Sequence, residues 1–184
     1  MAITLTYFGQ TSLPVEIEGL TPDWAKGKSL SDIERFEIFH GNQKIPLAEL
    51  FSVSGGAGDE RFELNGDLAR VHWVGAHMRS GQIHVHGAVG RHPGSEMRGG
   101  EIRVEGDAAD CVGCEMRGGL IHVRGNAGHL VGGAYRGSER GMRGGTIVVD
   151  GNVGDEVGLL MQKGTIVVGG RVGNMTGFDM TDGT

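Results

Sequence analysis

The stretch Val112-Gly-Cys-Glu-Met-Arg-Gly-Gly-Leu-Ile-His-Val-Arg-Gly125 is one copy of a motif that recurs between Val71 and Met180. The motif methionines are 19, 19, 26, 19 and 19 residues apart, at Met78, Met97, Met116, Met142, Met161 and Met180. A glycine stands three residues before each methionine except Met142, where Gly132 is ten residues away, so the insert of the long unit is roughly 134–140. A motif registered at several positions indicates a repeat fold.

A unit of this length is too short for a helical-hairpin repeat, which needs about 33 residues. Ile121 and Val123 stand two residues apart, so they would share one face of a strand, where β-branched residues are favoured. Antiparallel hairpins would not need one fixed register in every unit, whereas parallel coils place like residues on like at about 4.8 Å. We therefore predict an all-β fold, a right-handed parallel β-helix (solenoid) of 19-residue coils over 56–184, with columns of methionine, isoleucine and valine inside.

Residues 1–55 do not repeat, and we expect them to form a small α+β cap at the N-terminus. Alternating apolar residues predict strands at 3–7 and 13–17, which could pair with each other. Ser31, with a glutamate three positions later, matches a capping box, and Ser29 is a rival N-cap for the same short helix.

Two further signals lie where the leader joins the repeat. Gly41-Asn42 is expected to turn a hairpin between two apolar stretches. Phe62 and Leu64 anticipate the Ile-x-Val pattern 21 residues before Ile83, which predicts an irregular opening unit.

The overall composition excludes several classes of function. A net charge of −6 argues against a general affinity for nucleic acid or for an anionic membrane. No apolar run approaches the roughly 20 residues that span a bilayer, and residues 1–13 lack the pattern of a secretory signal. We predict a cytoplasmic protein whose two cysteines are too few for a disulfide scaffold.

The residues that resemble known reactive sites also fit the repeat. Cys111 and Cys114 have the spacing of a redox or half-metal motif, but small buried thiols at repeat positions explain both, and a structural zinc site needs four ligands. His84 and His122 share an outward position with Arg103 between them, so they would lie two coils apart, roughly 10 Å. We predict no catalytic, cofactor-binding or metal-binding residue in this chain.

Two features are candidates for contact with a partner. Insertions in solenoids form loops that often bind, and this insert offers Tyr135, Arg136 and Arg140. The residue after the methionine forms a row of stacked like charges at Arg79, Arg98, Arg117 and Arg143. Such a row needs neutralising, either by Glu96 and Glu115 or by an acidic partner.

The repeat, with Gly-Gly-Ala-Tyr-Arg-Gly-Ser-Glu-Arg-Gly-Met-Arg-Gly-Gly at 132–145, resembles the GXGXG repeat found in the family of C subunits of formylmethanofuran dehydrogenase. The segments Leu20-Thr-Pro, Gly27-Lys-Ser-Leu-Ser-Asp-Ile33, His40-Gly-Asn-Gln and Leu50-Phe-Ser-Val-Ser resemble that family's amino-terminal part. The repeat by itself also resembles the carboxy-terminal domain of the glutamate synthase large subunit.

The resemblance implies a scaffold in a multi-subunit complex, with the chemistry on other subunits. These are an amidohydrolase-like chain that holds zinc, a molybdopterin- or tungsten-site-like chain in the archaeal enzyme, and a formyltransferase in the bacterial one. Asp155-Glu-Val-Gly and Met161-Gln-Lys-Gly look closer to the bacterial formyltransferase/hydrolase complex. That complex moves a formyl group from formyltetrahydromethanopterin to a methanofuran-like carrier and releases formate in one-carbon metabolism.

Members of that family usually continue for further coils, whereas this sequence reaches Thr184 soon after its sixth unit opens. An uncapped solenoid end exposes strand edges and apolar side chains. We therefore expect either that the chain is truncated at its C-terminal end or that a partner covers this end.

Overall fold

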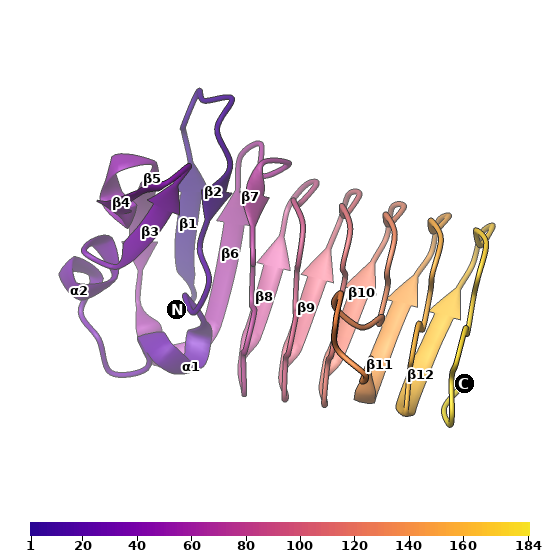
Figure 1. The fold of residues 1–184 in the computed structure, drawn as a ribbon. Helices are drawn as coiled ribbons and strands as arrows, with labels where there is room; N and C mark the ends of the chain where they lie inside the picture. The colour runs from indigo at the N-terminus through magenta and orange to yellow at the C-terminus, as the bar shows by residue number, and fades with distance from the viewer.

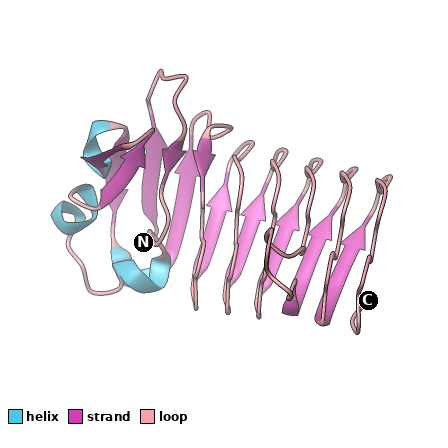
Figure 2. Cartoon of the chain, in the orientation of Figure 1, coloured by secondary structure: helices cyan, strands magenta, loops and turns pink.

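A computed structural model describes the backbone of residues 1–184 and every side chain except that of Ala57 (Figure 1). Strands dominate it, which confirms the all-β class (Figure 2). The α-helices, α1 (Pro22–Ala25) and α2 (Leu30–Glu34), have four and five residues, and η1 (Leu47–Glu49) and η2 (Ala57–Asp59) are single 3-10 turns. Within the described part of the chain, no helix has the length and apolar character needed to cross a membrane.

The strands form two sheets. The larger one has the spatial order β12 (Lys163–Val168), β11 (Arg143–Val149), β10 (Leu120–Val123), β9 (Glu101–Val104), β8 (Gln82–Val85), β6 (Arg61–Asn65), β1 (Ile3–Tyr7) and β5 (Phe51–Gly55). The smaller one has the order β4 (Gln43–Pro46), β3 (Glu37–His40), β2 (Val15–Glu16) and β7 (Val71–His72). In Figure 1 the repeat strands stand side by side in one row.

Consecutive repeat units pair in parallel, with like residue beside like. From β6 to β12 all strand pairs are parallel, and the isoleucines form one row through Ile83, Ile102, Ile121, Ile147 and Ile166. A second row of parallel bridges joins Leu68, Val89, Ala108, Ala127 and Val153. The antiparallel-hairpin alternative therefore does not hold for the repeat.

The apolar columns lie in the interior, as predicted. Met116 and Ile121 are 0% exposed, and burial of one such side chain contributes roughly 1.5–3 kcal/mol. The repeat glycines allow the columns to pack closely. Gly113 has a φ of +60°, and a Cβ added there would lie 2.5 Å from Cδ1 of Ile147. A side chain would thus be opposed both by the left-handed backbone and by the column beneath it.

The two leader strands do not pair with each other, so that prediction was wrong. β1 lies between β5, which is antiparallel to it, and β6, which is parallel to it, with Leu5 opposite Leu64. β2 pairs with β3 in antiparallel fashion and with β7 in parallel. Each leader strand therefore adds a row to one sheet of the repeat, because its apolar side chains continue the interior columns.

The helix cap and the hairpin of the leader are both well defined. The Oγ of Ser29 accepts the backbone N–H of Asp32 at 3.1 Å, and the Asp32 carboxylate accepts the Ser29 N–H at 3.1 Å. The capping box therefore begins at Ser29, and Ser31 lies inside the helix. The predicted turn at Gly41-Asn42 joins β3 to β4 and is confirmed.

The last unit has a partly exposed apolar surface. Met180 is 41% and Phe178 is 48% exposed, so the buried methionine column ends at Met161. Val157, Met161 and Ile166 line a hollow on this side. The expectation that a partner or further chain covers it stays a prediction.

Candidate functional site

Titratable side chains gather on the outward face of the larger sheet. Strand alternation turns Ile83 and Val85 of β8 inward, so His84 and, directly after the strand, His86 face outward. Parallel register places Glu63 of β6 beside His84. Glu105 comes directly after β9 on the other side. We call Glu63, His84, His86 and Glu105 the histidine–glutamate cluster.

One carboxylate oxygen of the cluster lies close to both imidazoles. Glu63 Oε2 is 3.3 Å from His84 Nδ1 and 2.5 Å from His86 Nε2. The two rings are 4.1 Å apart between centroids. The other ring nitrogen of His84, Nε2, lies 2.7 Å from Glu105 Oε1. His84 thus contacts one carboxylate through each of its nitrogens.

Guanidinium groups hold both carboxylates in place. Arg61 Nη2 contacts Glu63 Oε1 at 2.5 Å, on the side away from the histidines. Glu105 contacts Arg103 Nε at 3.1 Å and Arg124 Nη1 at 3.0 Å. Burial raises the pKa of Glu63, but hydrogen bonds from His86 and Arg61 outweigh it and leave that pKa below its usual value. The glutamates are therefore ionised at neutral pH.

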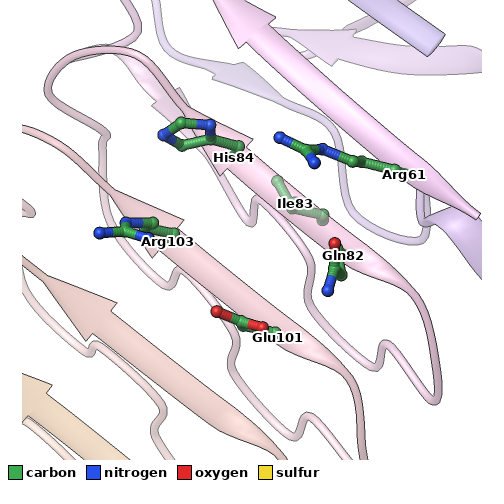
Figure 3. A pocket seen from close by; sticks show the side chains of 6 residues that line it. All are labelled: Arg61, Gln82, Ile83, His84, Glu101 and Arg103. Carbon is green, nitrogen blue, oxygen red and sulfur yellow. The ribbon is translucent and has the colours of Figure 1, made fainter. Parts of the chain in front are cut away.

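A pocket of about 230 Å³ opens beside the cluster. Figure 3 shows the side chains that line it, which come from β6, β8 and β9: Arg61, Gln82, Ile83, His84, Glu101 and Arg103. Its polar lining combines two guanidinium groups, an imidazole, an amide and a carboxylate.

His84 and His122 both face outward, as the sequence predicts, and each contacts its own carboxylate partner. The strand register places Arg103 between His84 and His122. His122 Nε2 lies 3.0 Å from Asp150 Oδ2, and Arg124 contacts Glu105. Glu105, Arg124 and Asp150 alternate in sign from coil to coil, and they form one ion pair, between Arg124 and Glu105. Glu63 was not singled out from the sequence, because it stands in the irregular opening unit.

The arginine row is partly neutralised within the chain. Arg117 Nη2 lies 3.8 Å from Glu96 Oε2, and Arg143 Nη2 lies 3.7 Å from Glu115 Oε2. Each glutamate thus pairs with the arginine of the following coil. Arg98 is exposed, as is Arg79, whose backbone N–H donates to Asp23. Contact of this row with a partner stays a prediction.

The insert is anchored to the stack through Tyr135. The rings of Trp73 and His92 are stacked at 4.0 Å and 12°, and Tyr135 packs on His92 at 5.7 Å with its hydroxyl 3.2 Å from Nδ1. The Tyr135 N–H donates to Glu115 Oε1 at 3.3 Å. Arg136 and Arg140 remain exposed, so they are the insert side chains available to a partner.

The cysteine pair is buried, as predicted. Cys114 Sγ lies 3.1 Å from the Leu130 carbonyl oxygen. A hydrogen bond from Cys114, with a further one from His92, outweighs burial and lowers the pKa of Cys111 to about 5. Burial raises the pKa of the Cys114 thiol. The pKa of Cys111 therefore lies below the usual cysteine value, and the pKa of Cys114 lies above it.

Comparison with known proteins finds relatives that match about half of this chain. No protein-family model matches it. The C subunit of the molybdenum-containing formylmethanofuran dehydrogenase 1 of Methanothermobacter thermautotrophicus is 40% identical over 91 residues, which are 49% of this chain and 23% of that protein. The C subunit of the tungsten-containing formylmethanofuran dehydrogenase 2 of the same organism is 40% identical over 96 residues, 50% of this chain and 36% of that protein.

A solved structure resembles nearly the whole chain. It is a chain of the formyltransferase/hydrolase complex from Methylorubrum extorquens in complex with methylofuran, with a TM-score of 0.88 and 27% identity over 98% of this chain and 74% of that chain. The stretches matched in the two curated relatives make up between 23% and 36% of their length. The curated homologues are thus the C subunits of formylmethanofuran dehydrogenases, which confirms the resemblance carried by the repeat and the leader.

Proposed function

We propose that this chain is a non-catalytic structural subunit of a formyltransferase/hydrolase complex in one-carbon metabolism. In this proposal the complex moves a formyl group from formyltetrahydromethanopterin to a methanofuran-like carrier and releases formate. The observation that carries the proposal is the likeness over 98% of the chain, at a TM-score of 0.88, to a chain of such a complex bound to methylofuran. In this proposal the chemistry and the catalytic metal cofactors, zinc among them, belong to the partner subunits.

The fold suits a scaffold because its interior is filled by side-chain columns. We further propose that the coils wind as a right-handed parallel β-helix. Parallel pairing of every repeat strand supports this winding, since crossovers between parallel strands of one sheet are right-handed in about 98% of cases. A stack of this kind presents long outward faces with fixed spacing to neighbouring subunits.

In this proposal the contact surface consists of the insert and of the first two members of the arginine row, Arg79 and Arg98. Arg136, Arg140, Arg79 and Arg98 are exposed. An acidic surface on a formyltransferase or an amidohydrolase-like subunit would neutralise Arg136 and Arg140 of the insert. The anionic tail of a carrier would satisfy the arginine row in the same way.

Affinity purification of the tagged chain from its host tests the assembly. We expect recovery of a formyltransferase and an amidohydrolase-like subunit. Recovery of a molybdopterin-type subunit instead would assign the chain to the archaeal type of complex, an alternative favoured by the 40% identity to those dehydrogenases. A glutaminase domain in the same reading frame would assign it to glutamate synthase. Recovery of none of these would refute the proposal.

Charge reversal tests the contact surface. The double variant Arg136→Glu with Arg140→Glu should reduce partner recovery. Lys28→Glu with Lys44→Glu changes the charge equally on exposed positions of the leader and is the matched control. Equal recovery of partners with both double variants would remove the insert from the interface.

A further inference from the structure

We propose that Glu63, His84 and His86 form a binding site for one divalent transition-metal ion, with Zn²⁺ as the best match. One ligand atom from each residue lies within 4.8 Å of the other two. The proposal goes against the expectation from sequence that the chain has no metal ligand. It is also independent of the proposed assembly, because all three residues belong to this chain.

The donor set has the composition of a zinc site. One class of zinc site has three protein ligands, two imidazole nitrogens and a carboxylate oxygen, and leaves a fourth position open. Here the donors are His84 Nδ1, His86 Nε2 and Glu63 Oε2. Zinc–nitrogen bonds of about 2.0–2.1 Å in a tetrahedron separate ligand atoms by about 3.3 Å. His84 Nδ1 and Glu63 Oε2 already stand 3.3 Å apart.

The third donor needs a small movement. His86 Nε2 lies 2.5 Å from Glu63 Oε2, so it must withdraw by roughly 1 Å to reach the spacing of zinc ligands. The His86 side chain is 41% exposed, the most exposed of the three, and can make this shift without displacing core residues. The His84 and Glu63 side chains, at 22% and 18%, stay where the sheet holds them.

The residues around the donors orient them as in known metal sites. A metal-bound histidine usually donates its other ring N–H to a carboxylate, which fixes the tautomer. His84 Nε2 has this partner in Glu105 Oε1 at 2.7 Å, so the Nδ1 lone pair is left for a metal. Arg61 holds Glu63 through Oε1, which leaves Oε2 for the ion.

Nearby positive charge sets the expected strength. Arg61 and Arg103 carry charges of the same sign as the metal, but each is paired with a cluster glutamate. We therefore expect weaker binding than at a zinc site without neighbouring cations. The ion would join β6 of the opening unit to β8 of the first full coil, so the melting temperature of the chain should rise with the logarithm of the metal concentration above the dissociation constant.

The test is direct titration of the full chain after treatment with chelator. Calorimetry with Zn²⁺ and visible spectroscopy with Co²⁺ should both give one equivalent. His84→Gln and His86→Gln should each weaken binding at least about tenfold, a loss typical of disturbed metal sites. His122→Gln removes an outward histidine that also contacts a carboxylate, and should leave the affinity unchanged.

A variant without the two cysteines distinguishes metal binding at this site from metal binding by the thiols. The variant Cys111→Ala with Cys114→Ala should retain the site, and circular dichroism should show that every variant keeps its β-sheet signal. The proposal is overturned if no saturable binding occurs, or if binding survives loss of both histidines and disappears with the cysteines.

Discussion

Replacing Ile121 with Ala should lower the free energy of unfolding by about 2–5 kcal/mol. Ile121 is 0% exposed and lies in the middle of its row, between Ile102 and Ile147. The change removes three buried carbon atoms at about 0.8 kcal/mol each, or about 2.4 kcal/mol, and a cavity cost adds to this transfer term. The neighbouring coils cannot close the gap, because strand pairs fix their spacing.

Urea titration followed by circular dichroism measures the change. Val167→Ala is the matched control, because Val167 is also β-branched but faces outward from β12 and is 48% exposed. We expect the control to stay within about 0.5 kcal/mol of the parent. If Ile121→Ala cost no more than Val167→Ala, the columns would not be the source of stability. Ile121→Asp should be more severe and disrupt both adjoining coils, because it buries a charge without a partner.

The remaining predictions concern charged and titratable groups. Arg98→Gln with Arg117→Gln should weaken use of the carrier in steady-state assays of the proposed complex while subunit recovery stays normal; unchanged kinetics would exclude a carrier contact. Asp32→Asn should lower the urea midpoint at pH 7, because hydrogen bonds from Ser29 stabilise the ionised Asp32 and lower its pKa to about 2. That contribution is present above pH 3.8 and is lost as the pH falls through about 2, so the two proteins should converge there. The Cys111 thiolate, followed by ultraviolet absorbance, should titrate near pH 5, and Cys114→Ala should move the midpoint upward because it removes the main hydrogen bond.

The repeat could be predicted from sequence because each coil carries its own register. Identical spacing of methionine, isoleucine and glycine determines which residues lie on which, and the parallel pairing of Ile83 with Ile102 follows that spacing. The leader could not be resolved in the same way. Leu5 pairs with Leu64, far along the chain, and a local alternation of apolar residues does not name such a partner.

The histidine–glutamate cluster shows the same limit. His84 and His86 stand out in the sequence, and their separation by two residues places both on one strand face. Their carboxylate partner comes from the opening unit, where Phe62 lies 21 residues before Ile83 and the regular spacing is broken. Only the register between β6 and β8 shows that Glu63 lies beside the two histidines.

The leader strands have a consequence for how the chain is made. β1 supplies a row of the larger sheet and β2 a row of the smaller one, so a template for both sides exists before the first repeat leaves the ribosome. Every later coil needs only the coil synthesised just before it. The polypeptide can therefore fold vectorially, because each new coil adds its strand to the edge left by the coil before it.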